Sequence, residues 1–423
     1  MKKLKIGVVG SGRGFDLSRN FMLLDCDVVA LCDSIEHRRE NGKKRFGSGV
    51  KVYDNFDEFI ECGLDAVIIA NFFHEHAPLI LKCFERNIHV YCECISNSTM
   101  AEGVALARAY EKTKSIFMLA ENYPQMLFNI EMQRVCKSGT LGKILFAEGE
   151  YNHPGNPEDA LWKSELNYFP KHWRNFLPRT YYITHSLGPV MRATGATPKR
   201  VTALYSYEPA NTSISTMSHV GDRVGIITTL NDDNSVFRVT GNASFGGADN
   251  SYRFCGTKGQ IENVRGMDDK VMLRYNDWEK PEGQAATSLY APSWNDPDEE
   301  LIAKSGHGGS DFLTARMFVR CIKEGKQPEH PFDLHSSLAM SSVAILGHRS
   351  ALAGGMPYDI PDFRQEEDRK KYENDVDSPF YYTDGREPTI PCCSHPDYKP
   401  SNGQIKSYIE KFLDSIDMTQ FKN

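Results

Sequence analysis

Two histidines and a tyrosine in this 423-residue chain have the side chains that proton transfer requires. His185 lies in the run YITHSLGPV, near the start of a predicted apolar helix. Its imidazole ordinarily titrates close to neutral pH, so it can take up or release a proton there. Tyr151 and His153 are two residues apart on a predicted strand and therefore share one face. The alternatives are that His185 is a buried histidine bonded to a backbone carbonyl and that Tyr151 is a plain strand aromatic.

The chain begins with elements that could position such residues. Residues 4–9 form a short, β-branched apolar run, and residues 16–24 carry apolar side chains at helical spacing. The turn between them consists of Gly10, Ser11, Gly12, Arg13 and Gly14. Strand, glycine turn and helix open a dinucleotide-binding unit, whose backbone N–H groups and helix N-terminus bind a pyrophosphate. The third glycine of the usual G-x-G-x-x-G lies one place early, and a glycine turn after any buried strand is the alternative.

An acidic residue at the end of the second predicted strand indicates which dinucleotide is bound. Residues 28–32 read as a buried strand, and Asp33 follows it, 23 positions after Gly10. Roughly 20 positions are expected for the acid that binds the ribose 2′-OH. Because an acid there repels a 2′-phosphate, we expect NAD rather than NADP. Arg38 and Arg39 follow closely and keep NADP open.

Strand and helix patterns alternate from the start of the chain to about residue 123. Six short strands with intervening helices predict a doubly wound parallel sheet with right-handed crossovers. In such sheets the ligand binds beyond the carboxyl ends of the strands. The segments that follow the strands there are residues 71–76, 93–96 and 121–123.

The second half of the chain has a different pattern. Alternating runs between residues 144 and 275 are separated by turns such as Asp232-Asp233-Asn234, which is typical of antiparallel hairpins. We therefore expect an α/β Rossmann domain over 1–124, an α+β domain with an open, mainly antiparallel sheet over 125–362, and an extension over 363–423. The free face of such a sheet is often offered to another subunit, so we expect a homo-oligomer through it.

Composition excludes several classes of partner. With 49 Lys and Arg against 56 Asp and Glu, the chain is mildly acidic, so we expect no nucleic-acid or anionic-membrane partner. No apolar run reaches the roughly 18 residues of a membrane span, and glycines interrupt any signal sequence. Eleven cysteines, mostly in apolar stretches and without a C-x-x-C pair, fit a cytoplasmic location. Cys392, Cys393 and His395 are a weak metal option, and we expect no metal.

Three motifs in the first domain resemble the Gfo/Idh/MocA sugar oxidoreductases. These motifs are IGVVGSG at 6–12, ANFFHEH at 70–76 and HVYCECI at 89–95. The resemblance puts His76 and Glu93 at the family's histidine and glutamate, and we expect both, with Asn71, to contact the cofactor. Cys94 replaces the family lysine, which in ordinary members orients the substrate and assists proton transfer. Alternatively, His74 and His76 form a helix-capping pair with no ligand role.

Three later motifs resemble a narrower branch of that family, the NAD-dependent glycosidases of the α-N-acetylgalactosaminidase type. They are AEGEYNH at 147–153, THSLGP at 184–189 and GHGGSDF at 306–312. The likeness covers roughly residues 1 to 363, and this branch lacks the family lysine too. It implies that the active-site residues are Glu121, Tyr151, His153 and His185.

Three further residues are candidates for substrate binding. Trp173 and Arg174 form a W-R segment of that branch, and His307 lies among glycines in a run that resembles a loop over a site. An indole can stack on a sugar face or pack in the core. His307 can instead belong to the N-terminal region of the helix that Ser310 begins.

These observations favour an NAD-dependent oxidoreductase that moves hydride between a sugar ring carbon and the nicotinamide, with His185 or Tyr151 as the base. The alternative is an NAD-dependent glycoside hydrolase. It would oxidise the C3 hydroxyl, eliminate the aglycone after loss of the C2 proton, add water and return the hydride. A third hypothesis is a non-catalytic NAD-binding sensor, which the missing lysine permits.

Overall fold

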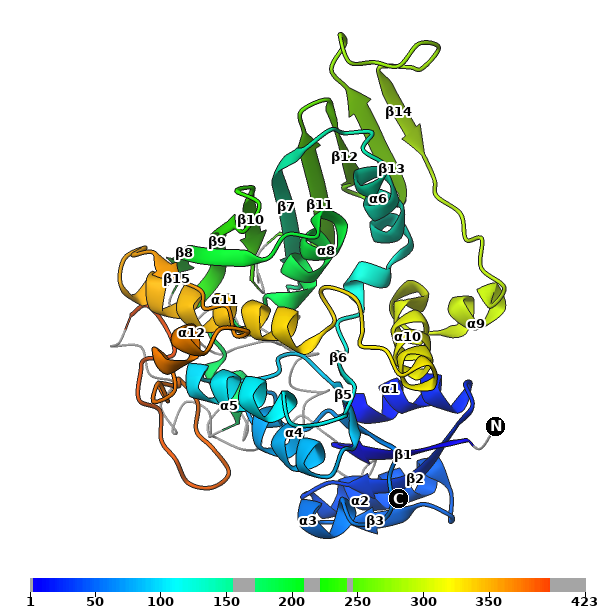
Figure 1. Ribbon diagram of the computed structural model, residues 1–423, viewed down its shortest axis with the longest axis vertical. Coiled ribbons are helices and arrows are strands. Elements are labelled where there is room, and N and C mark those ends of the chain that lie inside the picture. The colour runs from blue at the N-terminus through cyan, green and yellow to red at the C-terminus, as the bar shows by residue number, and fades with distance from the viewer. Residues whose placement is uncertain (1–2, 155–171, 209–220, 242–245, 396–423) are drawn as a thin grey trace, which may run out of the picture.

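The computed structural model in Figure 1 describes residues 3–154, 172–208, 221–241 and 246–395 of the chain. Its amino-terminal part is a six-stranded parallel sheet in the order β3-β2-β1-β4-β5-β6. The strands are β1 (Leu4–Val9), β2 (Cys26–Cys32), β3 (Lys51–Tyr53), β4 (Ala66–Ile69), β5 (His89–Cys92) and β6 (Phe117–Leu119). The helices between them are α1 (Arg13–Met22), α2 (Glu36–Phe46), α3 (Phe56–Phe59), α4 (His76–Glu85) and α5 (Met100–Tyr110). The doubly wound sheet predicted from the alternation is confirmed.

Local chemistry accounts for these elements. Strands of a sheet covered on both faces are apolar throughout, and all four residues of β4 are buried. Helix α5 begins with a capping box: Glu102 N–H donates to Thr99 Oγ1 at 3.2 Å, and Thr99 N–H donates to Glu102 Oε2 at 3.1 Å. Helix α1 begins at Arg13, three residues earlier than predicted, because the chain turns into the helix directly after Gly12.

The second sheet has nine strands in the order β14-β13-β12-β11-β7-β10-β9-β8-β15. They are β7 (Ile144–Asn152), β8 (Pro198–Tyr207), β9 (Asp222–Asn231), β10 (Val236–Thr240), β11 (Asp249–Gly256), β12 (Gly259–Val264), β13 (Met267–Tyr275), β14 (Thr287–Tyr290) and β15 (Tyr358–Asp359). Only β7 and β10 pair in parallel among these described strands, so the sheet is mainly antiparallel, as predicted. The edge strands β14 and β15 were not predicted, because four and two residues are too short for a clear alternation.

Helices cover one face of this sheet. They are α6 (Leu127–Lys137), α8 (Thr184–Thr194) and α11 (Leu334–Leu352), which pack against β12, β7 and β8. Helices α9 (Glu299–Lys304), α10 (Ser310–Glu324) and α12 (Glu366–Lys370) complete the set, with short 3-10 turns η1 (Tyr123–Gln125), η3 (Trp173–Phe176) and η4 (His307–Gly309). Figure 1 shows α10 beside α1 and α11 between the two sheets.

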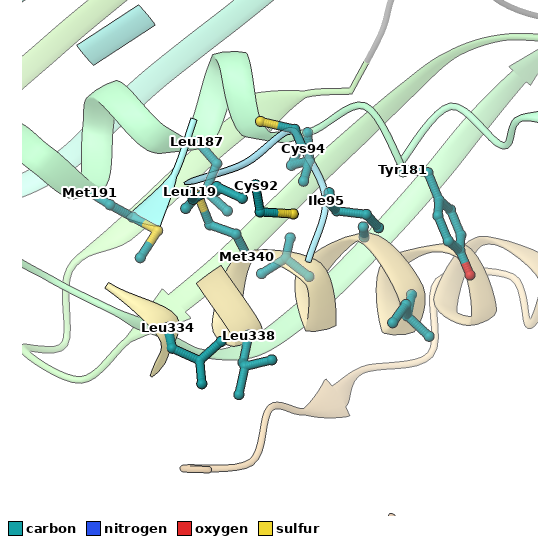
Figure 2. Packing of buried hydrophobic residues seen from close by; sticks show 14 of the residues in the cluster. Cys92, Cys94, Ile95, Leu119, Tyr181, Leu187, Met191, Leu334, Leu338 and Met340 are labelled. Atoms are coloured by element: carbon teal, nitrogen blue, oxygen red, sulfur yellow. The ribbon is translucent and has the colours of Figure 1, made fainter. Parts of the chain in front are cut away.

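One hydrophobic cluster runs from the first sheet into the second part of the molecule without a break. In Figure 2, Cys92, Ile95 and Leu119 at the ends of β5 and β6 lie among side chains of two helices. These are Leu187 and Met191 of α8 and Leu334, Leu338 and Met340 of α11. Because this shared core fixes α8 over the ends of β5 and β6, residues on α8 come to lie where a doubly wound sheet binds its ligand.

The described part of the predicted extension, up to residue 395, folds back onto the first domain. Ala101 N–H donates to Asp375 O at 2.9 Å, and Arg349 of α11 makes a paired hydrogen bond to the Asp375 carboxylate. Phe380 is fully buried in the shared core. The domain boundaries proposed at residues 124 and 362 stay predictions, and residues 396–423 of the extension lie outside the described part.

Candidate active site

The three glycines of the first turn have three separate reasons to be glycine. Gly10 has a φ of +82°, and a Cβ there would lie 2.3 Å from Ala70 O. A Cβ at Gly14 would lie 2.9 Å from Val8 Cγ1, so Gly14 lets α1 pack closely on β1. At Gly12 a Cβ would meet open space. The turn therefore leaves a bare backbone surface at the N-terminus of α1, which fits a dinucleotide pyrophosphate, and Gly14 fills the third glycine's role from one place earlier.

Asp33 closes this turn from the end of β2. Its Oδ2 accepts the Ser11 backbone N–H at 2.8 Å and the Ser11 hydroxyl at 2.9 Å. Oδ1 accepts Ile35 N–H at 3.0 Å. Arg39, which kept NADP open, donates instead to the Asp33 carbonyl at 2.8 Å. The acid thus lies against the glycine turn, where the expected ribose contact requires it.

The segments that follow β4 and β5 are joined by a hydrogen bond. His76 is buried, and its Nδ1 bonds Ile95 O at 2.7 Å, which makes Nδ1 the donor. Burial lowers the pKa of His76, so it stays neutral near pH 7. Asn71 Nδ2 donates to Glu75 O at 3.3 Å. The side-chain oxygen of Asn71 and Nε2 of His76 are buried and have no hydrogen-bond partner among the described residues.

The alternative that His74 and His76 cap a helix is wrong. Helix α4 begins at His76 itself, its N-cap residue is Glu75, and no side chain caps it. Nε2 of His74 lies 2.8 Å from Tyr381 O in the extension. Burial lowers the pKa of His74 to about 3. His74 is therefore neutral near pH 7 and links the first domain to the extension through this hydrogen bond.

Arg13, the first residue of α1, links the glycine turn to the far end of the chain. Its guanidinium donates to both oxygens of Asp311, at 3.0 and 2.6 Å, and Nε donates to Glu93 Oε1 at 3.4 Å. Glu93 Oε2 also accepts Cys94 N–H at 2.6 Å. The predicted cofactor residues Arg13 and Glu93 are therefore in direct contact at the carboxyl edge of the sheet.

Glu121 and His185 form a buried acid–imidazole pair. Nδ1 of His185 lies 2.9 and 3.0 Å from the two oxygens of Glu121, and the carboxylate is fully buried. Tyr123 N–H and the Cys94 thiol also donate to it, at 3.0 and 3.3 Å. Because an ionised carboxylate only accepts, Nδ1 of His185 carries a hydrogen, and Nε2 is left to take up a proton.

The charge of Glu121 is set by opposing effects. Burial alone raises the pKa of this carboxyl, but His185 and hydrogen bonds from Thr184 and Tyr123 N–H outweigh burial, so the pKa is lowered. Glu121 is consequently ionised near neutral pH. The position that the family lysine occupies in ordinary members holds the neutral thiol of Cys94, whose pKa burial and the two nearby carboxylates raise.

Aromatic rings surround His185. The Tyr123 ring is stacked on it at 4.1 Å between centroids, and Tyr151 and Tyr182 meet it edge-on at 4.8 and 5.2 Å. His153 lies 5.7 Å from Tyr151. Burial and the neighbouring tyrosines raise the pKa of Tyr151 well above its ordinary value, so this phenol keeps its proton. The structure thus brings the four predicted catalytic residues together.

The three residues predicted to bind substrate differ in burial and in what they contact. Trp173 is almost fully buried, with its ring stacked on Phe73 at 4.9 Å and the Arg174 guanidinium 4.5 Å from it, so it packs in the core. Arg174 acts electrostatically on Tyr151 and Tyr182. His307 is 42% exposed at its side chain and lies 6.2 Å from the Tyr123 ring. Their contact with a substrate stays a prediction.

Four residues of this site were not singled out from the sequence as site residues: Tyr123, Asn122, Tyr182 and Asp311. Tyr182 precedes His185 by three positions, and Asp311 follows His307 by four, so a helical spacing read outward from each histidine would have found both. Among the described residues, no group of three or more His, Cys, Asp or Glu could hold a metal ion. None of the described helices is long and apolar enough to cross a membrane.

Two family models match separate parts of the chain. Residues 4–121 match the oxidoreductase family with an NAD-binding Rossmann fold, Gfo/Idh/MocA. Residues 248–370 match the C-terminal domain of glycosyl hydrolase 109. Both resemblances stated from the motifs are confirmed, and with them the NAD-binding fold.

Curated relatives match most of the length of this chain. A glycosyl hydrolase family 109 protein of Stenotrophomonas maltophilia is 23% identical over 421 residues, with 86% of this chain and 89% of the relative covered. An α-N-acetylgalactosaminidase of Shewanella oneidensis is 22% identical, with 86% and 85% covered.

Solved structures share the fold. Levoglucosan dehydrogenase in complex with NADH and L-sorbose has a TM-score of 0.69 at 18% identity, over 86% of this chain and 100% of that one. The aldose-aldose oxidoreductase from Caulobacter crescentus, complexed with glycerol, has a TM-score of 0.66 at 17% identity, over 85% and 100%.

Proposed function

Because residues 4–121 match the Gfo/Idh/MocA oxidoreductase family and residues 248–370 match the glycosyl hydrolase 109 C-terminal domain, we propose that this chain is an NAD-dependent enzyme that acts on a carbohydrate by hydride transfer at a ring carbon. The observation that carries the proposal is the Glu121–His185 pair, which lies beyond the carboxyl ends of β5 and β6. A doubly wound sheet binds its ligand at this edge.

The residues that would hold NAD are those of the glycine turn and the adjacent strand ends. The backbone N–H groups of Gly12 to Gly14, at the N-terminus of α1, would bind the pyrophosphate, and Asp33 offers a carboxylate to the ribose. When bound, the nicotinamide supplies a reversible hydride acceptor. Arg13, at the glycine turn, is paired mainly with Asp311 and more weakly with Glu93.

His185 is the base of this proposal. Glu121 holds Nδ1 in its protonated form, so Nε2 accepts the proton of the sugar hydroxyl as the carbon is oxidised. A positioned base of this kind contributes typically 10²–10⁴-fold to the rate, or about 3–5 kcal/mol of barrier. Tyr151, whose pKa is raised, serves as a proton-bearing donor to the same substrate.

The second candidate is a glycoside hydrolase that uses the redox step internally. The match of residues 248–370 to the glycosyl hydrolase 109 domain and the thiol of Cys94 at the lysine position favour it. In a sugar oxidised to the ketone at C3, the proton on C2 is acidic. His185 Nε2 removes that proton, the C1–aglycone bond breaks, water adds across the new double bond, and the ketone is reduced again. Two carboxylates of the ordinary glycosidase kind are then not required.

One experiment separates these candidates. The purified chain is incubated with nitrophenyl glycosides and no added cofactor, and in parallel with free sugars and NAD. Repeated nitrophenol release supports the hydrolase and removes the simple dehydrogenase. Net NADH accumulation on a free sugar without cleavage supports the dehydrogenase. Binding of NAD without either reaction supports the sensor, and failure to bind NAD overturns the proposal as a whole.

The open face of the second sheet supports a further proposal about assembly. Leu204 and Ile226 are cross-strand neighbours on it and are 60% and 42% exposed. Next to them a hollow of about 650 Å³ contains the ion pairs Glu148–Arg238 and Glu150–Arg265. We propose that two copies associate through this face in the cytoplasm. Ile226→Asp is expected to reduce the molar mass measured by light scattering, and Met22→Asp, an exposed methionine on α1, is the control. An unchanged mass for Ile226→Asp contradicts the proposal.

A further inference from the structure

One carboxylate outside the catalytic group accepts hydrogen bonds from two distant segments and from the turn directly before its own helix. Asp311 is the second residue of α10 and is 2% exposed. Its Oδ1 accepts from Arg13 Nη2 at 2.6 Å and from Asn122 Nδ2 at 2.7 Å. Its Oδ2 accepts from Arg13 Nη1 and from His307 Nδ1, both at 3.0 Å. The hydrogen bonds of this carboxylate therefore join the glycine turn, the end of β6 and the glycine-rich turn η4.

The backbone around η4 is shaped to allow these contacts. A Cβ at Gly306 would lie 2.8 Å from Asp311 Oδ2, so any larger residue there would displace the carboxylate. His307 itself has a φ of +52°, in the left-handed region, and Gly308 and Gly309 continue with positive φ. A non-glycine residue rarely adopts this conformation, and it persists only where surrounding contacts hold it. The bond to Asp311 is such a contact.

The position of His307 gives this contact a functional meaning. Nδ1 of His307 is bound to the Asp311 carboxylate, so Nε2 is not used by this bond. The His307 side chain is 42% exposed. The Tyr123 ring lies 6.2 Å away on one side of His307, and the same Tyr123 ring is stacked on His185. His307 is therefore at the rim of the Glu121–His185 site, while Asp311 is buried behind it.

We propose that Asp311 is a positioning residue: it fixes His307 as the Nδ1–H tautomer with Nε2 directed to the sugar, and through Arg13 it ties that histidine to the cofactor turn. This proposal rests on the proposed function, because it makes Nε2 of His307 an acceptor for a substrate hydroxyl. Asp311 itself contacts neither substrate nor cofactor.

The tautomer can be measured without any turnover. The full-length chain is labelled with ¹⁵N-histidine, and the His307 signals are assigned by their loss in His307→Gln. At about pH 8, where an ordinary histidine is neutral, we expect the Nδ1–H tautomer. We expect Asp311→Asn to shift the signals toward the Nε2–H form. A wild-type His307 in the Nε2–H form overturns the proposal, even if Asp311→Asn does not fold.

A double-mutant cycle tests the functional half. Asp311→Asn is expected to lower kcat/KM for the glycoside or sugar at least about tenfold. In a His307→Gln background the same change is expected to cost less than about threefold, because the two residues act as one unit. Equal losses in both backgrounds overturn the positioning role. If no substrate is turned over, the proposed function fails, while the tautomer measurement still decides the role of Asp311.

The control is Asp25→Asn. Asp25 is exposed and accepts from Lys323 Nζ of α10 at 2.7 Å, so it also bridges α10 and the first domain, away from the site. We expect its kcat/KM to stay within about twofold of wild type. A loss as large as that of Asp311→Asn would mean that any ion pair between α10 and the first domain supports activity, and would overturn the specific role of Asp311.

Discussion

At the level of single residues, the two bases proposed from the sequence are no longer equivalent. The phenol of Tyr151 is buried among other tyrosines, which raises its pKa and keeps it protonated. The imidazole of His185 carries its proton on Nδ1, which leaves Nε2 as its acceptor nitrogen. Proton abstraction therefore falls to His185, and Tyr151 is better suited to donate.

Replacing these two side chains should separate the roles. We expect His185→Ala to lower kcat by about 10²–10⁴-fold, because the positioned base is lost. We expect Tyr151→Phe to lower it by more than tenfold. NAD affinity, measured by calorimetry, should be unchanged in both variants, since neither residue lies at the glycine turn. Unchanged turnover in both would mean that they are packing residues of the core.

The buried carboxylate of Glu121 should make stability depend on pH. Its pKa is lowered in the folded chain, so its contribution is fully present above the ordinary glutamate pKa of about 4.3 and is lost as pH falls through the lowered value. We expect Glu121→Gln to reduce the free energy of unfolding by about 1–3 kcal/mol near neutral pH.

Urea unfolding of wild type and Glu121→Gln across the acid range measures this difference. The gap between the two proteins should narrow as pH falls below about 4. A gap that widens in acid would contradict an ionised Glu121.

At the level of elements, two glycines of the first turn have different roles: Gly10 is needed for the fold, and Gly12 is needed for the proposed cofactor binding. At Gly12 a Cβ would meet open space, so the methyl group of alanine collides with nothing there, but the backbone, with a φ of −71° and a ψ of −102°, lies outside the regions that non-glycine residues prefer. Gly10 has a positive φ, and its Cβ would collide with Ala70 O. The same substitution therefore has two different physical consequences two residues apart.

Gly12→Ala should still fold, with a loss of about 1–3 kcal/mol in the free energy of unfolding from its backbone conformation. It should nevertheless bind NAD at least about tenfold more weakly, because the added methyl fills the space left for the pyrophosphate. Gly10→Ala should lose more than about 2 kcal/mol of stability from strain and collision. Normal NAD affinity in Gly12→Ala would mean that the dinucleotide does not lie on this turn.

At the level of the whole molecule, the described part of the extension packs against the first domain. Phe380 packs against Phe73 and Tyr181, Tyr382 bonds Ser98 at 2.9 Å, and Thr383 N–H donates to Glu75 Oε1 at 2.7 Å. Phe73, Glu75 and Ser98 lie in or next to the segments that follow β4 and β5, and Tyr181 lies just before α8. The extension thereby supports the loops that carry Asn71, His76 and Glu93.

Truncating the buried ring of the extension should show this support. We expect Phe380→Ala to cost about 3–5 kcal/mol, because it leaves a cavity in the shared core. Val376→Ala, at a residue 61% exposed on the same extension, should stay within about 0.5 kcal/mol. Urea unfolding measures both, and equal effects would mean that the extension is not part of the core.

Much of the first domain follows from local pattern. Buried strands read as β-branched runs, a glycine turn follows the first of them, and Thr99 and Glu102 have the spacing of the capping box that starts α5. The carboxyl ends of the strands of a parallel sheet meet at one edge, so the sequence pattern alone predicts that Asn71, Glu93 and Glu121 lie near one another. The short edge strands β14 and β15 could not, because their pairing depends on neighbours rather than on their own few residues.

Local sequence pattern is enough to place the dinucleotide-binding turn, the alternation that builds the first sheet, and the side chains able to move a proton. Which of these side chains meet depends on tertiary packing: Glu121 meets His185, 64 positions away, and Arg13 meets Asp311, 298 positions away. The physical reason is that these pairs form only when α8 packs over the ends of β5 and β6 and α10 packs beside α1. The packing of α8 follows from the shared hydrophobic core, and that of α10 from a second cluster in which Phe318 meets Phe21 of α1. No local spacing of residues encodes either cluster.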